Sequence, residues 1–246
     1  MSPSGEPRPL DRDSGKTLRA PHILSALLDE YDRGVIELDH SSPFELLIAT
    51  VLSAQSTDKM INQITKSLFV KYQRPEDYLA VPEEELQTDI KSSGFFRQKT
   101  KSIRGICQAL LADYDGQVPL RMADLLRLPG VARKTANVVL AGSAPQALID
   151  DPDAGIAVDT HVTRLSKRFG FTRHDDPVKI ERDLMRLFDK ADYGPASLVI
   201  ILHGRRVCDA LRPRCGGCVV EPLCPSSLLA GRRDKARQAK ALGLLD

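Results

Sequence analysis

Helix-start signals recur along this chain of 246 residues, whereas strand signals are almost absent. The segment SSPFELLIATVLSAQ at 41–55 has Ser42 as its N-cap, a proline at the first helical position and Glu45 three residues after the cap, which predicts a capping box. Asp176 and Pro177 open another helix in the same way, and its buried face is expected to carry Ile180, Leu184, Leu187 and Phe188. No sustained alternation of apolar and polar residues occurs. The sequence therefore predicts an all-α fold.

Apolar periodicity predicts the remaining helices and the domain organisation. Further helices are expected near residues 22–32, 58–71, 82–91, 98–112, 120–127, 131–141, 160–169 and 194–207. The segment at 142–155 is rich in Gly, Pro and Asp, which predicts a loop and a domain junction. We expect a helical domain at 37–153 and a discontinuous second domain made of 17–36 and 154–232. A flexible start (1–16) and a basic tail (233–246) are expected to flank them.

Composition and charge limit the class of protein. Apolar residues make up 42% of the chain, enough for a sizeable core. The net charge of +2 says little by itself, because nucleic-acid binding depends on where the cations lie. They are grouped at 97–104 and from Arg205 to residue 240, although each group would also fit a solvated helix face or a basic tail. The longest apolar run, 196–202, is too short for a membrane span, and the start has no apolar core of a signal peptide. We therefore expect a soluble, cytoplasmic protein with no membrane partner.

The segment LPGVARKTANVVL at 128–140 combines a Pro-Gly turn with two cations and an apolar helical stripe. It follows a short amphipathic segment at 122–128, so helix, tight turn and helix are expected, with Gly142 closing the second helix. Backbone N–H groups of such a turn and of the following helix start can bind a phosphate oxygen, which the helix dipole favours. An ordinary corner between two helices would have the same shape.

Four of the five cysteines lie within 17 positions, separated by six, two and five residues: Cys208, Cys215, Cys218 and Cys224. Four thiolates this close in sequence can converge on one metal centre. Disulfides are less expected in an unexported chain with an odd cysteine. Structural zinc is the stronger alternative, although zinc sites usually use two short knuckles and this run contains one. Cys107 is predicted to be a buried apolar residue.

These segments together resemble the endonuclease III branch of the helix-hairpin-helix DNA glycosylases. LPGVARKTANVVL is similar to the family's hairpin, and the likeness extends through SSPFELLIATVLSAQSTD at 41–58, AVDTHVTRLSKRFG at 157–170 and ILHGRRVC at 201–208. It covers residues 36–224. The resemblance implies a structural [4Fe–4S] cluster on the four clustered cysteines. It also implies a monomeric enzyme that excises oxidised pyrimidines from double-stranded DNA and cleaves abasic sites.

The resemblance assigns the catalytic roles to Lys134 and Asp159, which we expect at a cleft between the two domains. Lys134 would attack C1′ of the deoxyribose and expel the base as a Schiff base forms, and β-elimination would then nick the strand 3′ to the lesion. The amine must be partly neutral to attack, which the positive charge of Arg133 and the helix N-terminus would favour. Asp159 would stabilise positive charge on the sugar. Its residue pattern alone equally predicts the N-cap of a helix.

A damaged base inside the helical stack must be rotated out before these groups can reach it. The resemblance implies that Gln55 and Phe95 fill the gap, although Phe95 would also fit simple core packing. His161 is implied to line the DNA groove or is a satisfied helix histidine. The other implied DNA contacts are Gly130, Val131, Ala132 and Arg133 in the hairpin and the cations Arg212 and Arg214 in the cysteine run.

Two departures from the family pattern and two alternative functions stay open. Ala132 stands where the family usually has the second hairpin glycine, so either the backbone tolerates a β-carbon or the phosphate contact is weakened. The segment between Lys134 and Asp159 is also longer than usual. Adenine-removing relatives share the hairpin, aspartate and cluster but lack the lysine. A non-catalytic DNA-binding protein with a structural metal would need neither Lys134 nor Asp159.

Overall fold

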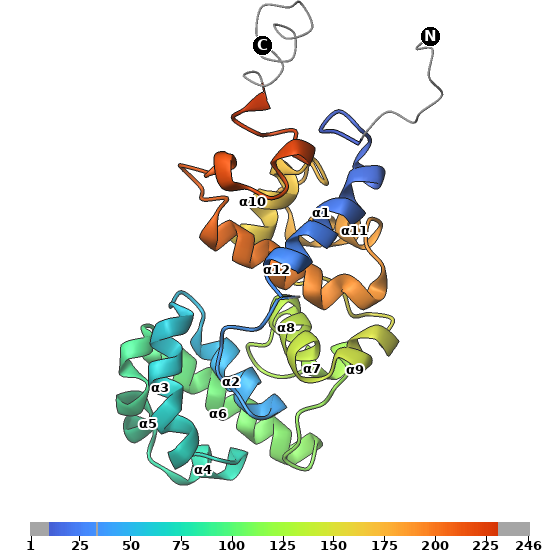
Figure 1. The fold of residues 1–246 in the computed structure, drawn as a ribbon. Helices are drawn as coiled ribbons and strands as arrows, with labels where there is room; N and C mark the ends of the chain where they lie inside the picture. The colour runs from blue at the N-terminus through green and yellow to red at the C-terminus, as the bar shows by residue number, and fades with distance from the viewer. Residues whose placement is uncertain (1–9, 33, 231–246) are drawn as a thin grey trace, which may run out of the picture. The chain divides into compact units, whose positions relative to one another are not determined.

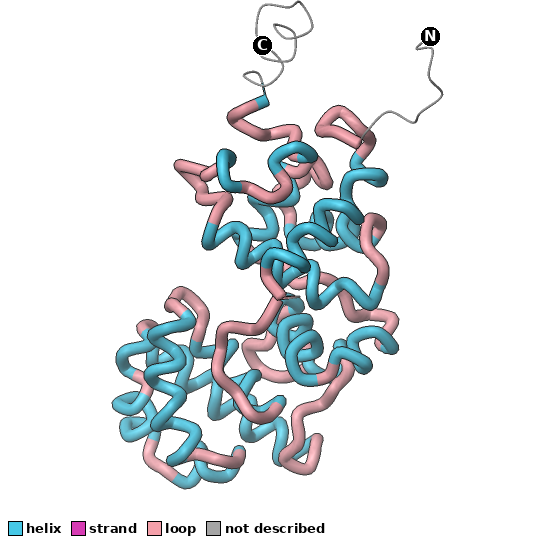
Figure 2. Tube along the Cα trace, viewed as in Figure 1, coloured by secondary structure: helices cyan, strands magenta, loops and turns pink. Residues whose placement is uncertain are grey.

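The computed structural model describes residues 10–32 and 34–230. These residues form helices and loops and contain no strand (Figure 2), which confirms the all-α prediction. No helix among them is long and apolar enough to cross a membrane. They divide into two compact units. One unit combines the chain up to Gly34 with the chain from Val158 onward, and the other is Val35–Ala157. The basic tail predicted at 233–246 and the first nine residues of the predicted flexible start lie outside the described residues.

The Val35–Ala157 unit is organised around α2 and α6 (Figure 1). Its helices are α2 (Pro43–Leu52), α3 (Asp58–Lys71), α4 (Pro75–Ala80), α5 (Glu83–Asp89), α6 (Phe96–Asp113), α7 (Met122–Leu125), α8 (Arg133–Ser143) and α9 (Pro145–Asp150), with the 3₁₀ turn η1 (Lys91–Ser93). Helix α2 packs against α3, α6 and α8, and α4 and α5 pack on α6. The short helices α7 and α9 both contact α8. The start of α8 and the turn after α2 thus belong to helices that pack against each other, and η1 contacts α3, α5 and α6.

The second unit is organised around α12, whose apolar residues are largely buried. Its helices are α1 (Lys16–Glu30), α10 (Thr160–Arg168), α11 (Pro177–Met185) and α12 (Tyr193–Arg206), with the 3₁₀ turns η2 (Lys190–Asp192), η3 (Cys215–Gly217) and η4 (Glu221–Leu223). Helix α12 packs against α1 and α10, and α10 also contacts α11 (Figure 1). The four-cysteine run follows α12 directly.

Side-chain caps explain where several helices begin. The side chains of Ser42, Asp159 and Asp176 each accept a hydrogen bond from the backbone N–H three residues later. The reciprocal half of the capping box predicted for Ser42 is wrong. Glu45 Oε2 accepts from the backbone N–H of Ser41, 2.6 Å away, because the chain enters the helix with that N–H turned toward the first turn. The cap at Ser42 is thus confirmed, but the Glu45 bond closes on the residue before it.

Helices α1 and α8 depart from their predicted bounds. Helix α1 begins at Lys16 and continues through Pro21, although the sequence suggested a start near residue 22. Pro21 removes one backbone hydrogen bond from α1. Burial of Ile23, Leu24 and Leu27 stabilises the helix despite that loss. Helix α8 runs past Gly142 to Ser143.

The segment at 142–155, predicted as a loop, contains α9. A β-carbon at Gly142 would collide with the side chains of Ile36 and Leu46. This glycine therefore lets those side chains pack closely against α8, and the helix continues past it. Helix α9 begins at Pro145, where a proline needs no hydrogen-bond partner for its nitrogen. Helix α4, which the periodicity missed, is too short to show a full apolar repeat.

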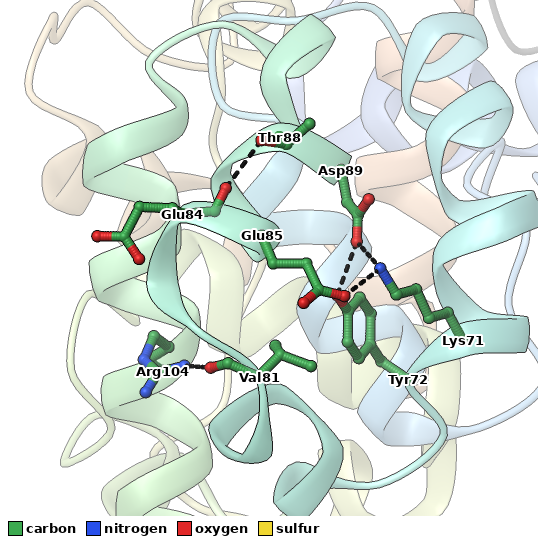
Figure 3. Close-up of polar contacts among 8 residues, drawn as sticks. All are labelled: Lys71, Tyr72, Val81, Glu84, Glu85, Thr88, Asp89 and Arg104. Carbon is green, nitrogen blue, oxygen red and sulfur yellow. Dashed lines mark hydrogen bonds and ion pairs between the residues drawn. The ribbon is translucent and has the colours of Figure 1, made fainter.

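A polar cluster fastens the end of α3 to α5 (Figure 3). Lys71 Nζ lies 2.6 Å from Asp89 Oδ2 and 2.8 Å from Glu85 Oε1, and Tyr72 Oη donates to the same Asp89 oxygen at 2.7 Å. Burial of Asp89 disfavours its ionised form, but the hydrogen bonds from Lys71 and Tyr72 outweigh it and hold the carboxyl pKa below its usual value. The cluster joins helices that are separated in sequence by α4.

Candidate nucleic-acid interface and metal-ligand loop

The predicted helix, turn and helix at 122–143 is present as α7, a hairpin turn at 128–132 and α8. The turn is closed by the Val131 N–H donating to the Leu128 carbonyl at 3.1 Å, and both side chains are buried. Gly130 is exposed and has φ +77°, and a β-carbon there would lie 3.1 Å from Ser102 Oγ. Both the left-handed conformation and the limited space therefore favour glycine at this position.

Helix α8 begins at an exposed residue that cannot cap it. Ala132, the N-cap, has φ −90° and ψ 166° and supplies no side-chain hydrogen bond. This φ is ordinary for any L-residue, so the backbone tolerates the β-carbon that replaces the expected glycine. Lys134 is exposed in the first turn of α8, and Arg133 beside it is partly buried. The first turn of α8 thus presents an amine next to helix N–H groups that no N-cap side chain covers.

Gln55 and Phe95 both lie in turns of the Val35–Ala157 unit and both have left-handed backbones. Gln55 follows α2 with φ 56°, and Phe95 precedes α6 with φ 48°. The side chain of Phe95 is 66% exposed, so the core-packing explanation for this residue is wrong. Large side chains rarely adopt this conformation in exposed turns unless their surroundings enforce it.

Asp159 in the second unit is the N-cap of α10, as its residue pattern predicts. Its Oδ1 accepts from the Val162 N–H at 2.8 Å. Asp159 also lines a pocket of about 720 Å³. The other lining residues come from α10, the residue before Asp159 and the start of α11 with the segment before it: Val158, Thr160, Thr163, Arg164, Lys167, Arg168, Asp175 and Pro177. Asp159 thus caps α10 and also borders a cavity.

His161 is half-buried in the first turn of the same helix. Burial lowers the pKa of its imidazole, while the charge of Asp159 acts in the opposite direction. Its Nδ1 lies 3.1 Å from Arg164, whose guanidinium can only donate, so Nδ1 is the acceptor. The same Arg164 nitrogen lies 2.9 Å from the Gly204 carbonyl and 3.2 Å from the Cys208 carbonyl. Arg164 thus links His161 to the end of α12 and to the start of the cysteine run.

All five cysteines, which lie within the described residues, are free thiols. Cys218 and Cys224 each lie within electrostatic range of both Cys208 and Cys215. Burial raises the pKa of the Cys218 thiol and of the Cys224 thiol to about 11. Cys107 is fully buried in α6, as predicted.

The segment between Cys208 and Cys215 carries exposed cations. Asp209 Oδ1 accepts from the backbone N–H groups of Leu211 and Arg212, which shapes this loop. Arg212 and Arg214 are exposed on either side of Pro213. Neither side chain is buried in the core, so both can contact an anion.

The sequence matches known proteins over most of its length. Residues 48–190 match the model of the HhH-GPD superfamily of base excision DNA repair proteins. The chain is 46% identical to endonuclease III of Synechocystis over 89% of this chain and 97% of that protein. It is 48% identical to endonuclease III of Bacillus subtilis over 82% and 89% of the two chains.

The chain belongs to the endonuclease III family. Its fold agrees with that assignment. The solved structure of a non-covalent endonuclease III–DNA complex covers 88% of this chain and 98% of its own, with 41% identity and a TM-score of 0.80.

Sequence reasoning missed the arginines that hold the cysteine run of this endonuclease III family chain. Arg168 NH1 lies 3.1 Å from Cys208 Sγ and 2.7 Å from the Asp209 carbonyl, and NH2 donates to the Ala210 carbonyl at 2.8 Å. Arg164, one turn earlier on α10, contacts the Cys208 carbonyl. The spacing of these two cations on one helix face was the available signal, but nothing local indicates acceptors some 40 residues away.

Membership of the endonuclease III family implies an iron–sulfur cluster on the cysteine run. Within 10–32 and 34–230, no group of three or more His, Cys, Asp or Glu side chains is placed to hold a metal ion. Cys218 and Cys224 nevertheless each lie within electrostatic range of the other three cysteines of this loop, and an arginine donates to Cys208 Sγ. Thiolates supported by hydrogen-bond donors are the ligands that iron–sulfur clusters take. The donor set fits such a cluster.

Proposed function

We propose that the chain is a bifunctional DNA glycosylase and abasic-site lyase that removes oxidised pyrimidines from duplex DNA. The observation that carries the proposal is the exposed Lys134 in the first, uncapped turn of α8, directly after the hairpin, in a chain of the endonuclease III family. The N–H groups of this turn would bind a DNA phosphate and bring the amine to the adjacent deoxyribose. The enzyme acts as a monomer in the cytoplasm, where the reducing conditions keep its thiols available for a metal.

In this mechanism the Lys134 amine attacks C1′ of the damaged nucleotide and the bond from C1′ to the base breaks. The base leaves with one proton from the attacking nitrogen. The C1′–O4′ bond then breaks, O4′ takes a proton, and a protonated Schiff base joins the nitrogen to C1′. Removal of a proton from C2′ then expels the 3′ phosphate, which nicks the strand. Nucleophilic lysines act this way only in the neutral form.

Asp159 stabilises the positive charge that develops on the sugar as the base departs. Its N-cap hydrogen bond to Val162 fixes the carboxylate, and the pocket at the start of α10 leaves it open to a ligand. His161 lies beside it and lines the DNA groove. Gln55 and Phe95 occupy the space that the extruded nucleotide leaves in the duplex.

The cysteine run holds a [4Fe–4S] cluster through Cys208, Cys215, Cys218 and Cys224. The cluster supplies structural cross-linking of the loop after α12. Arg212 and Arg214 are then presented to the phosphate backbone of the DNA. The pyrimidine preference follows from the likeness of the sequence to the family, and a panel of lesion-containing duplexes would test it directly.

Borohydride trapping tests the proposed nucleophile. On a duplex containing an abasic site or an oxidised pyrimidine, the unmodified protein should give a stable protein–DNA adduct and a nicked strand. Lys134→Ala should abolish both while leaving folding intact, because alanine is favourable in a helix. Lys101→Ala removes another exposed lysine, on α6 of the same unit, and should keep full trapping.

The outcomes separate the proposal from its alternatives. Adduct formation by Lys134→Ala would place the nucleophile elsewhere. Tight binding of duplex DNA by the unmodified protein without any adduct would support the non-catalytic DNA-binding alternative. Release of adenine without strand cleavage would support the adenine-removing relatives. Asp159→Asn should slow base release more than it slows cleavage of a preformed abasic site, because it removes the charge and leaves the amine in place.

A further inference from the structure

Lys99 is a buried lysine in a segment whose other cations suggested a surface patch. Only 5% of the residue is exposed, although it lies in the RQKTKSIR group at 97–104. Its Nζ donates to the Leu52 carbonyl and to the Ser93 carbonyl, both at 2.6 Å. Burial lowers the pKa of this amine. A cation is seldom placed in such surroundings without a specific task for its charge or hydrogen bonds.

Both acceptors of Lys99 are carbonyls at helix C-termini. Leu52 is the last residue of α2, and Ser93 is the last residue of η1. Carbonyls at these positions have no intrahelical partner and carry partial negative charge, so one ammonium satisfies two helix ends at once. Lys99 therefore fixes the distance between two segments that are about 40 residues apart in sequence.

A residue with a left-handed backbone follows each of these helix ends within three positions. The Gln55 turn (53–56) follows Leu52, and its Gln55 has φ 56°. The Phe95 turn (93–96) begins at Ser93, passes through Gly94 with φ 69°, and places Phe95 at φ 48°. The backbone N–H of Lys99 also donates to the Phe95 carbonyl at 3.1 Å. The side chain and the backbone of one residue thus hold both turns in conformations that large residues rarely adopt.

We propose that Lys99 is a positioning residue for base extrusion, which ties the Gln55 turn to the Phe95 turn so that both side chains enter the duplex as one unit. This inference rests on the proposed function, in which Gln55 and Phe95 fill the space left by the extruded nucleotide. A wedge that opens a stacked base pair must resist being pushed back. A buried ammonium bonded to the roots of both turns provides that resistance.

Arg104 supplies a matched control on the same helix. Its NH1 donates to the Tyr78 carbonyl at 2.8 Å and to the Val81 carbonyl at 2.9 Å (Figure 3 shows the bond to Val81). It is therefore also a cation of α6 that joins two backbone carbonyls, but its acceptors lie at α4 and before α5. Arg104→Met and Lys99→Met both leave two carbonyls without a charged donor. Only Lys99→Met releases the two turns.

The experiment measures extrusion with 2-aminopurine placed opposite a stable abasic analogue, together with single-turnover base release at saturating enzyme. Lys99→Met should lose most of the 2-aminopurine fluorescence rise and release the base at least tenfold more slowly than Arg104→Met. Affinity for undamaged duplex should stay within about twofold for both variants. In the Phe95→Ala background, Lys99→Met should add little further loss, because both changes disable the same wedge.

Lys99→Gln keeps an amide donor on a shorter side chain, so it should recover part of the rate of base release. It replaces Lys99→Met in the experiment if Lys99→Met does not fold. Equal extrusion and equal rates in soluble Lys99 and Arg104 variants would overturn the inference, since a purely structural role would affect both alike. Full additivity with Phe95→Ala would also overturn it. Failure of the unmodified protein to form an adduct or release a base would instead contradict the proposed function.

Discussion

Replacing Ala132 with serine should stabilise the protein and weaken its binding to DNA. The backbone of Ala132, with φ −90° and ψ 166°, is close to that of Thr57, with φ −85° and ψ 145°. The Thr57 hydroxyl caps α3 by accepting from the Met60 N–H at 3.3 Å. A serine at 132 can therefore cap α8 through the N–H of Thr135 without a change of backbone. A new N-cap contributes about 1 kcal/mol, which for a chain of this size raises Tm by roughly 2–4 °C.

The same hydroxyl would compete with the DNA phosphate for the N–H groups of α8. A hydrogen bond from a backbone amide to a charged acceptor contributes about 1.5–3 kcal/mol, and part of this is kept because the phosphate has other donors. We therefore expect a loss of about 1–2 kcal/mol, or roughly a five- to thirtyfold weaker Kd for an abasic-analogue duplex. Thermal unfolding and fluorescence anisotropy at one fixed salt concentration measure the two effects.

Ala132→Gly is the control, because glycine supplies no hydroxyl. It should bind the duplex as tightly as the unmodified protein or modestly more tightly, with a change in stability of only a few tenths of a kcal/mol. A rise in Tm for Ala132→Ser with an unchanged Kd would show that the α8 amides do not bind phosphate, which would refute the reasoning. An unchanged Tm would show that these amides already have partners in the free protein.

The remaining predictions concern the metal ligands and the α3–α5 cluster. Purified protein should contain about four irons per chain. Cys215→Ser should lose iron and soluble yield, whereas Cys107→Ser should keep its iron, and stoichiometric zinc without sulfide would contradict the cluster. Asp89→Asn should lower stability in urea at pH 5–7, because the folded pKa of Asp89 lies below its unfolded value of about 3.9. The gap from the unmodified protein should close as pH falls through the folded pKa, and Asp175→Asn, which removes a more exposed carboxylate, should show a much smaller gap. A gap that widens with acid would contradict this assignment.

The sequence by itself determined the features that depend on a few neighbouring residues. Helix starts at Ser42, Asp159 and Asp176 were readable because a cap joins residues three apart. Helix α3 was predicted with its observed bounds for a related reason, since its apolar stripe spans a full set of turns. The spacing of the four cysteines and the hairpin segment with Lys134 pointed to the endonuclease III family, to which the chain belongs.

Tertiary structure alone decided what became of individual side chains. Lys99 and Lys101 lie two residues apart in one cationic segment, yet Lys99 is buried on carbonyls and Lys101 is exposed. The left-handed turns at Gln55 and Phe95 likewise have no local signal, because the lysine that anchors them is 47 residues from its acceptor at Leu52. Arg168 meets Cys208 across 40 residues. A hydrogen bond between distant segments forms only after packing has brought its donor and acceptor together. No sequence pattern within either segment can therefore predict it.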